Sequence, residues 1–165
     1  MENKKLKKQL YAFVIGLNVI ILLTLFLPMF YCSSGDLTST TLNILGIQLF
    51  EGLLTGKIAD VQVIVFVIIY LVLLIQAIVM MVYSIKKMRD RDPRGVNYVV
   101  LSVFMLIVSI IIYIFMTVLS AQPDLTILLG QNTTDTFTAG FAPYLFLVAS
   151  LLMIIITKIA KKRNM

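Results

Sequence analysis

The 165-residue sequence contains no histidine, no tryptophan and a single cysteine, Cys32. Without histidine, the chain lacks the commonest general base and the commonest metal ligand of proteins. One cysteine cannot form a disulfide within the chain. Charged side chains are also scarce, at 13% of residues, which is about half the share in a soluble domain. These absences argue against acid–base and metal chemistry, so we expect no enzyme activity and no cofactor.

Apolar residues are what the chain has in excess. They make up 60% of the sequence, and the mean hydropathy is +1.01. A single soluble core of this size could not bury so much apolar surface. Four apolar runs, each close to the roughly 20 residues that cross a bilayer as a helix, lie at about 10–30, 61–83, 98–119 and 141–160. The sequence therefore predicts an all-α membrane protein, a single domain over residues 1–165 with four antiparallel transmembrane helices.

The placement of positive charge predicts the orientation of these helices. All but one of the 14 Lys and Arg residues fall in the segments 4–8, 86–94 and 158–163, and the exception is Lys57. Positive charge stays on the cytoplasmic side of a membrane. We therefore expect a plasma-membrane protein with both termini and the inner loop, 84–97, in the cytoplasm. The basic residues flank apolar segments, so their expected partner is the lipid bilayer and not nucleic acid.

The N-terminal segment has a second interpretation. Lysines, an apolar stretch and the small residues Cys32, Ser33 and Ser34 are also typical of a secretory signal peptide. The apolar stretch is longer than the roughly 7–15 residues of a signal core, so we favour a first transmembrane helix.

The two predicted outer loops, 31–60 and 120–140, carry strand-like patterns. Apolar and polar residues alternate over 42–44 and 47–49 with Gly46 between them, as in a strand with a bulge or bend. Phe50, Leu53 and Leu54 have the spacing of a helical turn. Residues 125–128 and 136–138 are further candidate strands. We expect a small extracellular β cap over the bundle, although mobile polar loops that happen to alternate would have the same pattern.

Polar residues inside the predicted spans are the default candidates for function, because burying them in lipid is costly. Asn18 in the first span and Gln76 in the second lie at similar predicted depth. They could belong to a polar site or substrate path. We favour the structural interpretation, a hydrogen bond between helices that contributes about 0.6–2 kcal/mol. The spans contain no carboxylate to carry a proton, which argues against a proton-coupled antiporter.

The inner loop contains alternating charges, with Arg89, Arg91 and Arg94 among them. The simplest interpretation is a solvated loop that sets the topology. The alternative is a docking loop for a cytoplasmic partner.

The overall layout resembles that of claudins, with four spans, termini inside and a longer first outer loop. Leu27-Pro28, Gly46, Gly52 and Gly140 also stand where small four-span proteins of unknown function from low-GC Gram-positive bacteria have such residues. The chain has neither the Trp nor the two Cys of the claudin signature, so the resemblance implies topology and no activity.

We expect a non-enzymatic protein that acts through contacts, as a structural, assembly or immunity-type partner of other membrane proteins or as a homo-oligomer. The alternative is a small transporter or channel subunit that uses Asn18 and Gln76.

Overall fold

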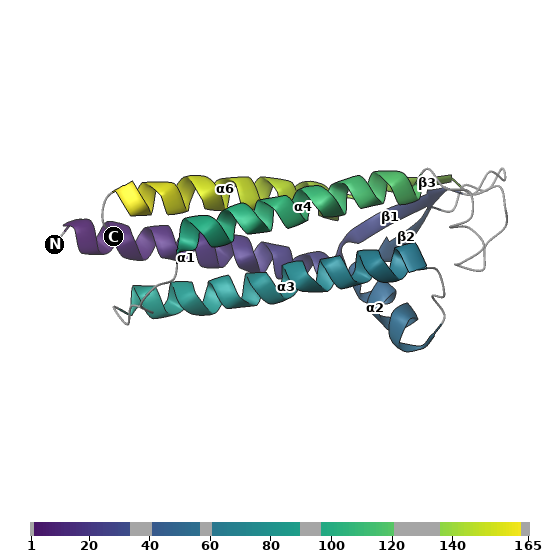
Figure 1. The fold of residues 1–165 in the computed structure, drawn as a ribbon, viewed down its shortest axis with the longest axis horizontal. Helices are drawn as coiled ribbons and strands as arrows, with labels where there is room; N and C mark the ends of the chain where they lie inside the picture. Colours follow the sequence, from purple (N-terminus) through teal and green to yellow (C-terminus); the bar gives the residue numbers. More distant parts are fainter. Residues whose placement is uncertain (1, 34–40, 57–60, 90–96, 121–135, 163–165) are drawn as a thin grey trace.

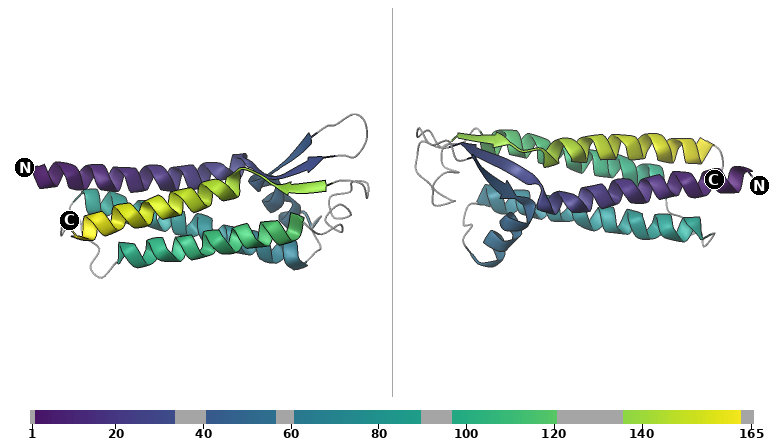
Figure 2. Two further views of the ribbon diagram at one scale, coloured as in Figure 1. Left: turned by 90° about the horizontal axis from the view of Figure 1, so that it is seen from above. Right: turned by 180° about the vertical axis from the view of Figure 1, so that it is seen from behind.

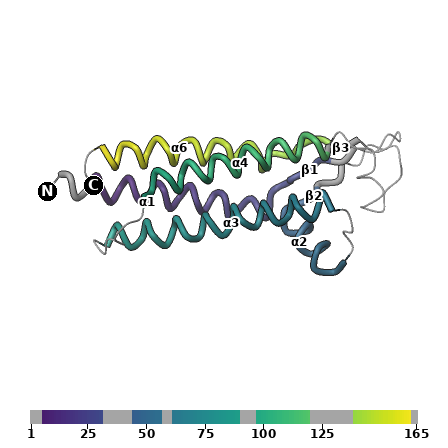
Figure 3. Tube along the Cα trace, in the orientation of Figure 1, coloured from purple at the N-terminus to yellow at the C-terminus, as the bar shows by residue number. Residues whose placement is uncertain are grey.

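Four long helices run side by side and make up most of the molecule (Figure 1). The computed structural model describes residues 2–33, 41–56, 61–89, 97–120 and 136–162. The long helices are α1 (Glu2–Leu23), α3 (Val61–Met88), α4 (Tyr98–Ser120) and α6 (Ala142–Lys162). Contacts join α1 to α3, α3 to α4, α4 to α6 and α6 to α1. The helices therefore form a closed ring of four antiparallel neighbours, with the N- and C-terminal ends together (Figures 2 and 3).

Sequence features at the helix ends explain where these helices begin and end. Asn97 precedes α4, and its Oδ1 accepts a hydrogen bond from the Val99 N–H at 3.2 Å, which satisfies a free donor of the first turn. Pro143 lies in the first turn of α6, where a missing N–H costs nothing. Lysines occupy the last turns of α3 and α6, where positive charge meets the negative end of the helix dipole.

A three-stranded antiparallel sheet covers the end of the bundle away from the termini (Figure 1). Its strands are β1 (Pro28–Ser33), β2 (Thr41–Leu45) and β3 (Thr136–Ala139), in the order β2-β1-β3. Tyr31 pairs with Asn43 on one side and Thr138 on the other. The predicted β cap is therefore present, and strands at 42–44 and 136–138 are confirmed.

The sequence predicts a first transmembrane helix over residues 10–30, and this prediction is wrong at its C-terminal end, where the central strand of the sheet begins. The α-helix ends at Leu23, a 3₁₀ turn (η1, Thr24–Phe26) follows, and Pro28 begins β1. The Thr24 hydroxyl donates to the Ile21 carbonyl, and the Leu27 N–H bonds to the Thr24 carbonyl at 3.1 Å. Proline has no N–H to continue the helix, so the chain turns here and becomes extended.

The segment after Gly46 is a second correction. Residues 47–49 were predicted as a strand, but they belong to helix α2 (Gly46–Leu54). Gln48 Oε1 accepts a hydrogen bond from the Leu45 N–H at 2.8 Å, which stabilises the helix start in the manner of a capping box. The helical spacing predicted for Phe50, Leu53 and Leu54 is confirmed. The candidate strand at 125–128 lies outside the described residues.

Aromatic rings fill the core where the sheet meets the bundle. Tyr70 stacks on Phe50 with ring centroids 5.4 Å apart and also contacts Phe146 at 5.5 Å. Phe30 from β1 packs on Phe66 at 5.9 Å. These contacts tie α2, α3, α6 and the sheet into one core, so the sheet is a packed part of the fold.

Candidate functional site

Asn18 and Gln76 are both buried inside the bundle and lie at about the same level. Tyr98 of α4 shows that Tyr11 of α1 and Tyr83 of α3 lie at the same height in the bundle. Its ring contacts that of Tyr11 at 5.4 Å, and its hydroxyl donates to the Tyr83 carbonyl at 3.0 Å. Asn18 follows Tyr11 on α1 by as many residues as Gln76 precedes Tyr83 on the antiparallel α3.

The amide groups of Asn18 and Gln76 nevertheless bond to other groups. Asn18 Nδ2 donates to the Val14 carbonyl of its own helix at 2.7 Å. Gln76 Nε2 donates to the Leu101 carbonyl of α4 at 2.9 Å. Asn18 Oδ1 and Gln76 Oε1 find no hydrogen-bond partner among the described residues. Gln76 therefore joins two helices, as expected of a structural residue, but its partner is α4. Both amide oxygens remain open to a donor.

Hydroxyl groups supply the other polar contacts of the interior. Ser109 on α4 and Ser150 on α6 share a hydrogen bond of 2.9 Å. On the same two helices, nearer the end that holds the termini, Ser102 Oγ and Thr157 Oγ1 lie 3.3 Å apart. Each of these hydroxyls also donates to a carbonyl of its own helix. Because these groups satisfy one another or the backbone, they hold the helices together and leave little polarity for a path through the bundle.

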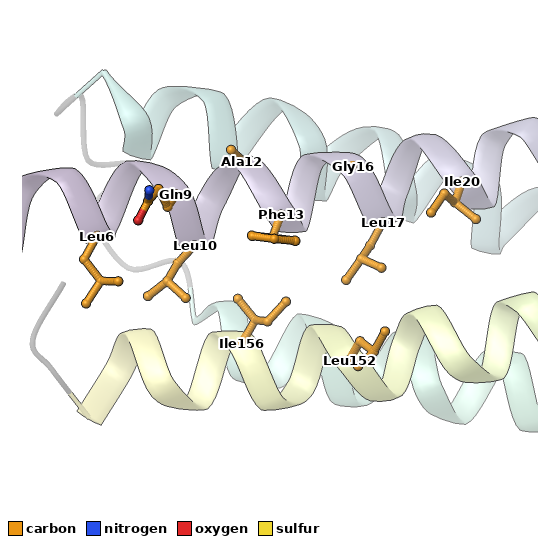
Figure 4. A pocket seen from close by; sticks show the side chains of 10 residues that line it. All are labelled: Leu6, Gln9, Leu10, Ala12, Phe13, Gly16, Leu17, Ile20, Leu152 and Ile156. Atoms are coloured by element: carbon orange, nitrogen blue, oxygen red, sulfur yellow. The ribbon is translucent and has the colours of Figure 1, made fainter.

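A groove runs between α1 and α6 on the side of the bundle (Figure 4). It encloses about 860 Å³. Its walls are apolar except for Gln9. Figure 4 shows Leu6, Leu10 and Leu17 of α1 pointing toward α6 and Ile156 of α6 pointing back, while Ala12 projects from the side of α1 away from α6. The lining residues are Leu6, Gln9, Leu10, Ala12, Phe13, Gly16, Leu17, Ile20, Leu152 and Ile156.

The groove exists because α1 is only partly covered by the other helices. In its apolar stretch 28% of residues are buried, against 50% in α3, and Phe13 is 66% exposed. A Cβ added at Gly16 would meet no atom of the described residues within 4 Å. Ala12 and Gly16 thus leave an open strip along the helix where larger side chains would fill the space.

Ala12 and Gly16 were not among the predicted site residues. The available signal was their spacing, because two small residues four positions apart on an apolar helix mark a surface of close approach. That signal does not say whether the surface is covered inside the same chain. The open space at Gly16 shows that it is not.

Positive charge is concentrated at the end of the bundle where the groove begins. Exposed lysines at the termini end of the bundle include Lys8 on α1 and Lys158, Lys161 and Lys162 on α6. Glu2 is the one acidic residue in these two helices. Arg89, from the predicted docking loop, follows α3 at this same end and is exposed. Arg91 and Arg94 lie outside the described residues.

Within the described part of the chain, no three His, Cys, Asp or Glu residues come close enough to hold a metal ion. Comparisons of the chain with protein-family models, with curated proteins and with solved structures found no significant match. The interpretation of the site therefore depends on its geometry.

Proposed function

We propose that this chain is an integral protein of the plasma membrane that crosses the bilayer four times. The support is the combination of length and surface. All four long helices are long and apolar enough to cross a membrane, and large apolar side chains are exposed along each of them. Examples are Ile20 and Leu23 on α1, Ile68 and Ile75 on α3, Ile107 and Ile114 on α4, and Leu151 and Ile155 on α6. Lipid is the solvent that such a surface requires.

The orientation follows from the two ends of the bundle. Lysines of α1, α3 and α6 gather at the end that holds both termini, and the sheet occupies the other end (Figure 2). By the positive-inside rule, the termini lie in the cytoplasm and the sheet lies outside.

Thiol labelling in intact cells tests this topology. Single cysteines would replace Ser39, Gly95, Thr134 and Asn164, one at a time, in a Cys32→Ser background. A membrane-impermeant reagent should label positions 39 and 134 and leave 95 and 164 protected until the cells are opened. Labelling of position 95 in intact cells would contradict the proposed orientation.

The function that the geometry supports best is contact with other membrane components, as a structural, assembly or immunity-type partner without catalysis of its own. The observation that carries this proposal is the groove between α1 and α6, which opens sideways to the surrounding bilayer. Contacts inside the chain do not explain the missing side chain at Gly16, although glycine within a helix is unfavourable. We infer that this surface is left open for contact with another molecule.

Photo-crosslinking in the membrane tests the contact function. A photoreactive amino acid at Phe13 would probe the groove, and one at Val103 provides a matched control, since Val103 is also apolar and exposed but lies on α4. We expect a discrete cross-linked product from position 13 and only diffuse reaction with bulk lipid from position 103. Equal, diffuse labelling from both positions would refute the proposal.

The two open amide oxygens favour one alternative, a small transporter or channel subunit. Asn18 Oδ1 and Gln76 Oε1 are buried at one level without a partner in the described part of the chain, and such oxygens could contact a passing solute. In that case, purified protein in liposomes should conduct a solute, and the double substitution Asn18→Leu, Gln76→Leu should abolish the flux at equal protein incorporation. Flux unaffected by this substitution would exclude the two residues as the path.

A further inference from the structure

The groove between α1 and α6 has the dimensions of one leaflet of a bilayer. Its lining on α1 extends from Leu6 to Ile20, a rise of about 21 Å at 1.5 Å per residue. One leaflet of hydrocarbon is about 15 Å deep. The groove therefore begins at the basic end of the helix and reaches about to the bilayer midplane or slightly beyond. A transmembrane helix of a partner would need a surface that continues through both leaflets.

Charge distinguishes further between the possible occupants. The groove begins at the end of α1 and α6 that carries their exposed lysines. Lys8 lies one turn before the lining residue Ala12, and Lys158 and Lys161 lie at the same end of α6 outside the lining. A second copy of this chain would bring its own lysines to the same level, and other membrane helices also carry their positive charge on the cytoplasmic side. Neither occupant adds a charge that these lysines attract. The phosphate of an anionic lipid is attracted to such a cluster.

From these observations we infer that the groove binds an anionic phospholipid of the cytoplasmic leaflet. One acyl chain lies along Gly16 between α1 and α6, and the headgroup phosphate lies among the lysines at the helix ends. Long lysine side chains reach toward the headgroup level while their stems cover apolar surface. Gln9 is the polar lining residue nearest this end, and its amide provides a hydrogen-bond donor there.

Gly16 has a defined part in this site. A leucine at position 16 would extend into open space, because no described residue lies within 4 Å of an added Cβ. It would occupy the volume of the acyl chain without a clash inside the bundle. Gly16→Leu is therefore expected to expel the lipid while leaving the fold intact.

Native mass spectrometry of the purified full chain in detergent tests the inference, with phosphatidylglycerol and phosphatidylcholine added in equal amounts. The wild-type monomer should retain phosphatidylglycerol in preference to phosphatidylcholine. Gly16→Leu should lose the retained lipid, and Val103→Leu, on exposed α4 surface, should keep it. The double substitution Lys158→Gln, Lys161→Gln should lower the preference for the anionic lipid about tenfold.

A charge-matched control uses the same end of the bundle. Lys86→Gln, Lys87→Gln removes two positive charges from the last turn of α3, away from the groove, and should leave the lipid preference unchanged. An equal loss in this control would mean that surface charge alone selects the lipid and would overturn the inference. Equal retention of both lipids by the wild type would do the same.

Two further outcomes separate this inference from the proposals on which it rests, namely that the chain spans a membrane and acts by contact. A dimer that Gly16→Leu dissociates would assign the groove to a second copy, which overturns the lipid site and leaves the contact function standing. Lipid binding by the purified monomer does not depend on topology. Labelling of position 95 from outside would therefore refute the orientation, and with it the assignment to the cytoplasmic leaflet, but not the binding itself.

Discussion

At the scale of single residues, two glycines have opposite surroundings. An added Cβ at Gly140 would lie 2.2 Å from the Pro28 carbonyl oxygen, and the Gly140 N–H donates to the Met29 carbonyl at 2.7 Å. The chain between β3 and α6 passes directly against β1, and only glycine permits this approach. At Gly16, none of the residues that the structure describes comes within 4 Å of an added Cβ.

This difference predicts opposite effects of the same substitution. Gly140→Ala should destabilise the protein by about 2 kcal/mol or more, because β1 must move to admit the methyl group. Gly16→Ala should be neutral or stabilising by up to about 1 kcal/mol, since alanine favours the helix. Unfolding in mixed micelles of mild detergent and dodecyl sulfate measures both. Equal destabilisation by the two substitutions would contradict the packing described around them.

The polar residues of the interior lead to a second prediction. Gln76→Leu removes one hydrogen bond to the Leu101 carbonyl and also removes an amide oxygen that has no partner in the described structure. A hydrogen bond between membrane helices contributes about 0.6 kcal/mol on average, so the net change should stay within about 1 kcal/mol. The same unfolding titration measures it. A loss well above this value would show that the amide oxygen has a partner supplied from outside the chain.

At the scale of elements, α2 and the sheet surround one end of the bundle. Gly46, the first residue of α2, packs against Tyr70, whose hydroxyl would lie 2.9 Å from an added Cβ. The Tyr70 hydroxyl also hydrogen-bonds to Thr24 Oγ1 at 3.2 Å. One tyrosine thus connects α2, α3 and the end of α1. The outer face of α2 is different, because Leu54 at its end is 86% exposed.

We predict that Leu54 lies in the outer interface of the membrane, where an exposed apolar side chain is solvated by lipid. A nitroxide attached to cysteine at position 54, in a Cys32→Ser background, should collide more with oxygen than with a water-soluble nickel complex. Gln48, an exposed polar residue on a different face of the same helix, provides the control and should show the reverse. A water-like ratio at both positions would place α2 outside the membrane.

At the scale of the whole molecule, apolar surface surrounds the bundle and charge is confined to its ends. A surface of this kind cannot be hydrated without aggregation. We predict that the protein remains in the membrane pellet after alkaline carbonate extraction and enters solution only with detergent. Release by carbonate alone would indicate that the helices lie on the membrane or associate with other proteins outside it.

Much of this architecture could be predicted from residues close together in the sequence. The number and apolarity of the long helices follow from runs such as 61–83 and 98–119, whose length and composition suffice for the prediction. The strand at 42–44 and the helical turn beginning near Phe50 were also evident from local periodicity. The extension of α3 to Met88 was missed, because Lys86 and Lys87 resemble a loop although they suit the end of a helix.

The central strand β1 could not be recognised in this way. Pro28, Met29 and Phe30 continue the apolar run of the first helix, so hydropathy does not separate them from it. Their conformation is determined by pairing with β2 and β3, and β3 lies more than a hundred residues away in the chain. A strand between two partners depends on contacts that a local pattern does not contain.

The sequence by itself determined that this chain consists of four long apolar helices with positive charge at one end, because hydropathy and charge are properties of individual residues. Only the tertiary structure decided which surfaces remain uncovered. Gly16 looks like any glycine in a helix, and only the packed bundle shows that the described residues leave the space beside it open. Asn18 and Gln76 likewise share a level in the bundle, but side-chain geometry directs their amides to separate carbonyls.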